Sequence, residues 1–313
     1  MYLVTGANGF IGKNLVGFLK QRGIPVRTVS RLKECSYPIE DFNDQINWSK
    51  ALQGVKVVIH LASKVHDFDN ENKNRWHEYL VTNVKATENL AKSAANAGVK
   101  RLIYLSSIKV NGEKTDYDKD FQDTLNDKPI GLYALSKFQA EKSLMQISSK
   151  TELELIIIRP SLVYGPGVKA NFLKFLDIIH TGIPLPFGSI KNFRSLCYVY
   201  NLVDFIYHLS IIENVPKFPL LFADPYPLST KEIIIIISRI FKKKVSLIPI
   251  PEFLLVLIFK FFRKYENYSK LIDSLRVDVD KSISSVNYKF KFNSKEGLEN
   301  TAMWYLRKNV NNK

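Results

Sequence analysis

A tyrosine, a lysine four residues later and a serine upstream form the clearest set of reactive side chains in the sequence. Tyr133 and Lys137 lie in a helical stretch, 131–149, and therefore share one helix face. Ser107 ends an apolar run, 101–107, that has the composition of a β-strand. A phenol can exchange a proton with a substrate oxygen, a nearby ammonium lowers the phenol's pKa, and a serine hydroxyl can orient the same oxygen. The set predicts proton transfer by Tyr133, helped by Lys137 and Ser107, while a hydride moves.

The hydride carrier for such a reaction is a nicotinamide dinucleotide, and the sequence TGANGFIG is suited to bind one. Its three glycines are spaced three apart, between a predicted strand and a helix near 10–22. Glycine lets the backbone approach a pyrophosphate closely, and the helix N-terminus attracts the anion. The cofactor-binding residues predicted in this loop are Gly6, Asn8, Gly9, Phe10, Ile11 and Gly12.

The end of the second predicted strand lacks the carboxylate that commonly binds the adenosine ribose of NAD. In PVRTVSRLKE, residues 25–34, Ser30 and Arg31 stand at that place, and Lys33 follows. A hydroxyl and a guanidinium favour a 2′-phosphate. NADP(H) is therefore the predicted cofactor, contacted by Ser30 and Arg31, and NAD(H) is the alternative.

The alternation of apolar runs and helical stretches indicates which fold positions these residues. It predicts an α/β fold with a doubly wound parallel Rossmann sheet and a smaller C-terminal α/β substrate-binding lobe. We expect a dinucleotide-binding domain over 1–165 and a substrate-binding lobe over 166–313 that exchanges elements with it. The predicted strands are 1–5, 25–30, 56–62, 101–107 and 154–160, and the predicted helices lie near 10–22, 72–97 and 131–149.

The composition indicates the cellular compartment of the protein and the charge of its binding partners. The formal net charge of +15 favours anionic partners, although an AT-rich genome that prefers lysine codons would give the same excess. The basic residues are dispersed and no nucleic-acid-binding module is present. Two cysteines suit a reducing compartment, the five histidines are not spaced as metal ligands, and no signal peptide precedes the first strand. These features predict a cytoplasmic protein with no metal.

Several motifs resemble the extended short-chain dehydrogenase/reductase family, also described as NAD-dependent epimerases and dehydratases. They are TGANGFIG, VIHLAS, TNVKATENL, YLSSIKVNGE, YALSK, IIRPSLVYGPGVKANF and NFRSLCYVYNLVD, and they cover nearly the whole chain. The resemblance implies a Rossmann sheet, a UDP-sugar substrate and, in many members, a homodimer formed through two helices of each chain. It implies that Ser107, Tyr133 and Lys137 are catalytic. It adds cofactor contacts at Asp41, Leu61, Ala62 and Asn83, and substrate contacts at Lys109, Asn171 and Arg194.

Within that family, SSIKVNGE, YGPGVKANF, GIPLPFGSIKNFRSL and ADPYPLST are most similar to 4-ketoreductases that form UDP-N-acetylquinovosamine-type sugars. The implied reaction is NAD(P)H-dependent reduction of a UDP-4-keto-6-deoxy-N-acetylhexosamine for bacterial O-antigen or capsule. The alternative is an NAD-dependent 4-epimerase acting on a UDP-hexose or UDP-N-acetylhexosamine, or on a lipid-diphosphate-linked sugar. Arg31 favours the reductase, because an epimerase retains NAD.

The sequence departs from the family pattern at three places. Asn111 replaces a common tyrosine, and Ala134 replaces a common glycine, but neither change removes a catalytic group. The second phosphate-binding arginine has only two weak candidates, Arg276 and Lys270. A silent dinucleotide-binding regulator is disfavoured because the tyrosine and lysine are both present. A 4,6-dehydratase is disfavoured because SSIKVNGE lacks the Asp-Glu pair that such an enzyme needs.

An apolar stretch near residue 250 leaves two interpretations open. The run from Phe253 to Phe259 is far shorter than the roughly 20 residues that cross a bilayer, and Lys260 interrupts it. It is either a core-packed helix of the small lobe or a helix on the inner face of the membrane. In the second case Arg263 and Lys264 would lie near lipid phosphates.

Overall fold

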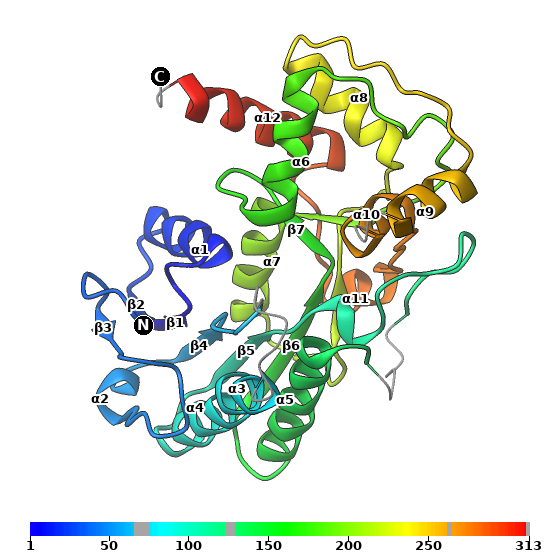
Figure 1. Cartoon of the computed structure of the whole chain (residues 1–313). Helices are drawn as coiled ribbons and strands as arrows, with labels where there is room; N and C mark the ends of the chain where they lie inside the picture. Colours follow the sequence, from blue (N-terminus) through cyan, green and yellow to red (C-terminus); the bar gives the residue numbers. More distant parts are fainter. Residues whose placement is uncertain (66–74, 123–128, 262–264, 311–313) are drawn as a thin grey trace.

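A seven-stranded parallel sheet forms the centre of the chain, as predicted (Figure 1). The computed structural model describes residues 1–65, 75–122, 129–261 and 265–310. The strand order is β3-β2-β1-β4-β5-β6-β9, and every neighbouring pair is parallel. The bounds are β1 Tyr2–Thr5, β2 Val26–Ser30, β3 Tyr37–Pro38, β4 Val57–His60, β5 Arg101–Leu105, β6 Glu154–Pro160 and β9 Leu220–Phe222. The short edge strands β3 and β9 were not predicted.

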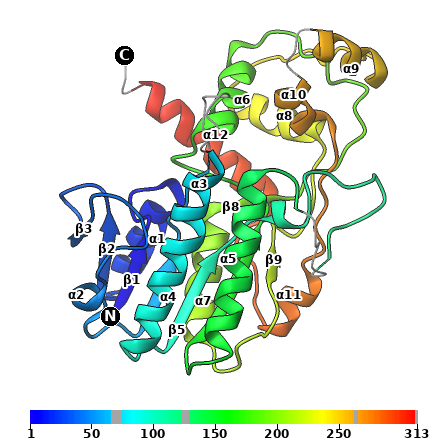
Figure 2. The same cartoon turned by 60° about the horizontal axis from the view of Figure 1, so that its bottom comes forward.

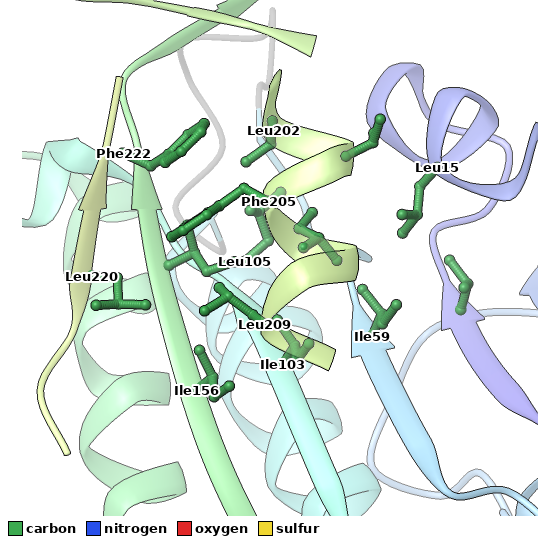
Figure 3. Packing of buried hydrophobic residues seen from close by; sticks show 14 of the residues in the cluster. Leu15, Ile59, Ile103, Leu105, Ile156, Leu202, Phe205, Leu209, Leu220 and Phe222 are labelled. Atoms are coloured by element: carbon green, nitrogen blue, oxygen red, sulfur yellow. The ribbon is translucent and has the colours of Figure 1, made fainter. Parts of the chain in front are cut away.

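Helices cover both faces of the sheet, and each face has its own core. On one face lie α1 Phe10–Gln21 and α7 Val199–Ile211, whose apolar side chains pack on β1, β4, β5 and β6. Figure 3 shows Leu202, Phe205 and Leu209 of α7 beside Leu105 and Ile156 of the sheet. The other face is covered by α2 Ser49–Leu52, α4 Ala86–Asn96 and α5 Leu132–Ser148. The nearly continuous apolar strands are therefore buried on both sides.

The helix predicted near 72–97 consists of three segments in the described residues. They are α3 Arg75–Tyr79, a π-helical stretch η1 Leu80–Lys85, and α4. A short 3₁₀ helix, η2 Ile108–Val110, follows β5. π-helical turns are rare and are frequent at functional sites, because they displace side chains from the regular helical faces. Asn83 lies in this one.

The C-terminal part builds a further core, separate from the two on the sheet faces, above the carboxyl ends of the strands (Figure 2). Its elements are α6 Ala170–Thr181, α8 Thr230–Ile240, α9 Glu252–Phe261, α10 Tyr265–Ile272 and α12 Ser294–Val310, with a two-stranded parallel sheet of β7 Leu162–Tyr164 and β8 Leu196–Tyr198. A further helix, α11 Asp280–Ser285, contacts β9. Although α7 and β9 come from residues after 166, they belong to the main sheet layer. Within the described ranges no helix is long and apolar enough to cross a membrane.

Candidate active site

The predicted cofactor and catalytic residues gather where the parallel strands end. Gly6 follows β1, Leu61 and Ala62 follow β4, and Ser107 comes two residues after β5. Loops at the carboxyl ends of parallel strands form the ligand crevice in open α/β sheets. The sheet register places β1, β4 and β5 side by side, so these loops lie next to one another.

The glycine loop packs so closely that side chains are excluded at two of its glycines. Gly6 has a φ of +66°, and a Cβ added there would lie 2.7 Å from the backbone nitrogen of Ala62. A Cβ on Gly12 would lie 2.2 Å from the carbonyl oxygen of Gly6. These contacts hold the turn between β1 and α1 against the end of β4, as a close backbone approach to a ligand requires.

The first turn of α1 offers backbone donors to an anion. The helix starts at Phe10, its N-cap Gly9 supplies no side-chain hydrogen bond, and no acidic residue lies in the first turn. Its first N–H groups, including those of Phe10 and Ile11, have no intrahelical acceptor, and the helix dipole favours negative charge at this end. The loop therefore fits the pyrophosphate of a dinucleotide, and Gly6, Gly9 and the start of α1 would hold it.

The end of β2 is connected to the glycine loop through Ser30. The Asn8 amide donates a hydrogen bond to the Ser30 hydroxyl, which also accepts one from the backbone N–H of Leu32 at 3.1 Å. The side chain of Arg31 is exposed beside it. Asp41 is exposed after β3 and accepts from the Phe42 backbone N–H at 2.8 Å. Ser30 thus stabilises the loop, while Arg31 stays accessible to a ligand.

The side chains of Tyr133 and Ser107, which are far apart in sequence, lie close enough that hydrogen bonding by the Ser107 hydroxyl lowers the pKa of the Tyr133 phenol. The side chain of Ser63, which follows Ala62 after β4, has the same effect. Ser107 caps η2 by accepting from the backbone N–H of Lys109 at 3.3 Å. Sequence reasoning missed Ser63, although the motif VIHLAS ends on it. A substrate oxygen placed at the phenol would therefore meet hydroxyls from two strand ends.

The predicted effect of Lys137 on Tyr133 is wrong for this structure. Burial raises the pKa of Tyr133 to about 12, and the hydrogen bonds from Ser107 and Ser63 offset this only in part. Burial also lowers the pKa of Lys137 to about 7, against the opposing effect of Glu141. The Lys137 amine donates to the Leu105 carbonyl at 2.9 Å and lies 4.6 Å from the centre of the Tyr104 ring. Lys137, only partly protonated at neutral pH and turned toward the sheet, does not lower the pKa of Tyr133 in this structure.

Asn83 joins the loop after β4 to the catalytic helix. Its carbonyl oxygen accepts from the Lys64 backbone N–H at 2.8 Å, and its amide donates to the Lys64 carbonyl at 3.0 Å and to Ser136 at 2.9 Å. The Ser136 hydroxyl in turn donates to the carbonyl of Tyr133 at 2.8 Å. Asn83 is buried, so each of these bonds is shielded from water. In this structure the predicted cofactor residue holds the protein scaffold around the site.

A buried ion pair fixes α5 to β6 one helical turn beyond Lys137. The Arg159 guanidinium donates two hydrogen bonds to the Glu141 carboxylate, one of them at 2.9 Å, and both side chains are fully buried. A third bond runs from Arg159 to the Asn111 carbonyl oxygen at 3.0 Å. The Asn111 amide then donates to the carbonyl of Gln122 at 3.0 Å. Asn111, noted as a departure from the family pattern, is thus part of this network.

The predicted substrate residues lie on three different elements. Lys109 in η2 forms an ion pair with Glu113 at 2.9 Å, and Asn171 is exposed in the first turn of α6. Arg194 is buried and donates to the carbonyl of Asp273 at 3.1 Å, and burial lowers its pKa to about 10. A buried guanidinium that bonds a neutral carbonyl keeps its charge for an anionic ligand.

The two candidates for a second phosphate-binding cation differ in their surroundings. Arg276 pairs with Asp120 at 2.6 Å and donates to the carbonyl of Tyr117 at 3.2 Å. Its guanidinium also lies 5.6 Å from the ring centre of Phe193, the neighbour of Arg194. Lys270 is exposed at the end of α10. Arg276 therefore lies near Arg194 but already binds a carboxylate.

Comparison with known proteins places this arrangement in a family. Residues 2–215 match the model of the "NAD dependent epimerase/dehydratase family". The chain belongs to this family. The family assignment made from the motifs is thereby confirmed, and the chain is an enzyme of the extended short-chain dehydrogenase/reductase type.

Two curated proteins are similar to this chain over different lengths. A UDP-glucose 4-epimerase of Vibrio cholerae is 35% identical over 314 aligned residues, which cover 98% of this chain and 96% of the relative. An N-acetyl-alpha-D-glucosaminyl-diphospho-ditrans,octacis-undecaprenol 4-epimerase of Escherichia coli O157:H7 is 31% identical over 211 residues, 65% of this chain and 61% of the relative. Among solved structures, a UDP-glucuronic acid 4-epimerase from Bacillus cereus in complex with NAD has a TM-score of 0.77 at 19% identity and 98% coverage of both chains. That structural likeness supports the fold.

Proposed function

We propose that the chain is a 4-epimerase of UDP-hexoses or UDP-N-acetylhexosamines that works with a retained NAD. The observation that carries this proposal is the 35% identity to the UDP-glucose 4-epimerase along almost the whole of both chains. This is the alternative named from the sequence, and the relatives favour it over the ketoreductase.

The proposed roles of the side chains follow from their contacts. A bound NAD would supply the acceptor for the hydride of the sugar's C4 and, once reduced, its donor. The Tyr133 phenol exchanges a proton with the oxygen on C4, and the Ser107 hydroxyl, hydrogen-bonded to that phenol, orients the oxygen. The Lys137 amine, held beside the Leu105 carbonyl, is positioned at the strand ends where the nicotinamide ribose would lie. Arg194 would pair with the substrate diphosphate.

An assay of isolated product distinguishes the two reactions. We expect incubation with UDP-glucose or UDP-GlcNAc, without added reductant, to give a mixture of C4 epimers by ¹H NMR. In parallel, UDP-4-keto-6-deoxy-GlcNAc with NADPH should remain unreduced. Stoichiometric consumption of NADPH with the 4-keto sugar, and no epimer from either UDP-sugar, would reverse the assignment in favour of the ketoreductase.

The ketoreductase stays the second candidate because of the cation at the end of β2. Arg31 is exposed next to Ser30, where a 2′-phosphate would be attracted rather than repelled. We expect Arg31→Asp to weaken NADPH binding about tenfold or more and to leave NADH binding nearly unchanged, because the loss acts only on the extra phosphate. Fluorescence titration of both cofactors measures this.

Lys33→Asp is the matched control for that experiment, since it reverses a second exposed charge two residues along the chain. It should have a smaller effect on NADPH than Arg31→Asp. If both variants lose the same NADPH affinity, the positive charge of the whole region, and not a specific contact with Arg31, determines the preference for NADPH over NADH. If the unmodified chain binds NADH more strongly than NADPH, the result supports the NAD-dependent epimerase. Arg31 at the end of β2 would then no longer be an argument for the ketoreductase.

We also propose that the chain forms a homodimer through α4 and α5, as the family resemblance implies. The outer sides of η1, α4 and α5 line a shallow depression of about 350 Å³, which Leu80, Val84 and Gln139 border together with charged and polar side chains. A second copy packed on these two helices would cover it.

A further inference from the structure

Helix α9 exposes a stripe of large apolar side chains along one face. Phe253 is 70% exposed, Leu257 is 64% exposed and Phe261 is 82% exposed. These residues are four apart and therefore line up along the helix. Leu254 and Ile258 widen the stripe and are also exposed. An apolar surface of this kind on a soluble chain marks an interaction site more often than a chance exposure.

The opposite face of α9 packs into the C-terminal lobe and accounts for the rest of its apolar residues. Leu255 is buried, and the ring of Phe259 stacks on Tyr268 of α10 at 3.9 Å. At 3.6 residues per turn, the five exposed side chains occupy an arc of about 140°, and Leu255 and Phe259 lie outside it. Core packing, the first interpretation of this sequence, explains only the inner face.

The charges on and around α9 match a negatively charged surface. Lys260 lies at the edge of the exposed stripe, next to Phe253 and Leu257 on the helical wheel, whereas Glu252 lies on the side of Phe259. From residue 239 to residue 270 the sequence contains eight Lys or Arg and only two Glu. A lysine beside an apolar stripe can bury its alkyl stem and reach lipid phosphates with its ammonium.

The position and length of α9 suit a helix lying on a membrane. Both views place α9 at the outer edge of the C-terminal lobe, away from α4 and α5 (Figures 1 and 2). Its 10 residues extend about 15 Å, half the thickness of a bilayer core. Arg263 and Lys264, expected from the sequence to lie near lipid phosphates, are outside the described residues.

We propose that α9 docks the chain on an anionic membrane surface, with Phe253, Leu254, Leu257, Ile258 and Phe261 inserted among the lipids. The docking face is linked to the substrate side of the lobe. The Leu271 carbonyl near the end of α10 accepts a hydrogen bond from Asn192 at 3.0 Å, and the Asp273 carbonyl directly after α10 accepts the one from Arg194. The helix next to α9 is therefore bonded to the segment that carries the proposed diphosphate-binding arginine. The docking does not depend on which reaction the site performs.

Co-sedimentation with vesicles tests the proposal. Vesicles of phosphatidylglycerol and phosphatidylcholine are compared with pure phosphatidylcholine, for the full chain and for the triple variant Phe253→Ser/Leu257→Ser/Phe261→Ser. We expect the full chain to bind the anionic vesicles, less so as salt is raised, and the triple variant to bind at least tenfold more weakly. Ile211→Ser, which removes a 57% exposed apolar residue at the far end of α7, is the matched control and should bind as the full chain does.

Two further measurements show whether weaker vesicle binding by the triple variant is due to the lost apolar side chains or to misfolding. Circular dichroism and epimer formation from a soluble UDP-sugar verify that the triple variant is folded, because its substitutions lie outside the proposed site. No binding of the full chain to anionic vesicles, or equal binding by the triple variant, overturns the proposal. Light scattering tests a second occupant of the stripe. If the full chain does not bind vesicles, and the triple variant has a lower molar mass than the full chain, the stripe is an interface with a second copy, and the membrane proposal is overturned.

Discussion

Replacing Tyr133 by phenylalanine is expected to lower turnover by about a thousandfold or more while dinucleotide binding stays intact. The substitution removes only the hydroxyl that Ser107 and Ser63 hold by hydrogen bonds, and the ring stays in place. The proposed epimerisation moves a proton between this hydroxyl and the oxygen on C4, both when the hydride leaves C4 and when it returns. Phenylalanine has no hydroxyl and cannot exchange that proton. Single-turnover kinetics and cofactor titration measure the two effects separately.

Tyr104→Phe is the matched control for this experiment. The Tyr104 ring lies under the Lys137 amine, and its buried hydroxyl has no hydrogen-bond partner among the described residues. Removing that hydroxyl leaves the Lys137 contact with the ring and should change turnover less than about threefold. Retention of more than a tenth of the activity in Tyr133→Phe would remove Tyr133 as the proton donor. Equal losses in the two variants would mean that packing, not proton transfer, is being measured.

Breaking the buried pair between Arg159 and Glu141 is expected to have the largest effect on stability. Glu141→Gln leaves the guanidinium buried with an uncharged partner, and loss of one partner from a buried ion pair costs about 3–5 kcal/mol of unfolding free energy. Denaturant unfolding of the chain measures this loss. Because Glu141 lies one turn from Lys137 and opposes the burial effect on the lysine, the same variant should also lower the pKa of Lys137 further.

Two control variants test whether the loss of stability in Glu141→Gln comes from the unpaired charge that is left in the core. Asp116→Asn breaks an ion pair with Lys119 whose side chains are both 71% exposed, and it should change stability by less than about 0.5 kcal/mol. The double variant Arg159→Met/Glu141→Leu should recover most of the stability lost in Glu141→Gln, because it removes both charges from the core. A Glu141→Gln chain as stable as the unmodified one would show that the carboxylate's charge contributes nothing there.

The sequence predicted the sheet well because the signals for its central strands are local. The apolar runs ending in Thr5, His60 and Leu105 carry strand propensity within a few residues, and the glycine loop identifies the first turn by itself. The edge strand β9 is only three residues long, and it pairs with residues of β6 that are more than 60 positions away in the sequence. Such an element is defined by tertiary contacts that no short window of sequence contains.

The sequence indicated that Ser107, Tyr133 and Lys137 lie together, but it did not indicate their electrostatics. Helical spacing places Tyr133 and Lys137 on one face, as the sequence indicated, and the hydrogen bond between Ser107 and Tyr133 brings two distant motifs together. The pKa prediction failed because it counted the charge of Lys137 and not the burial of both side chains. Where the lysine amine points, toward the Leu105 carbonyl, is decided by β5 and not by the helix that carries it.

The late position of β9 and α7 in the sequence has a consequence for how the chain folds. When the first 165 residues have left the ribosome, β6 is paired with β5 but still lacks its second neighbour, β9, and the part of the sheet face that α7 covers is bare. Leu202, Phe205 and Leu209 of α7 are completely buried in the finished protein. An open strand edge beside exposed apolar surface is prone to aggregation, and pairing residues more than 60 positions apart is slow. We therefore expect the nascent N-terminal half to depend on chaperones until α7 and β9 are synthesised.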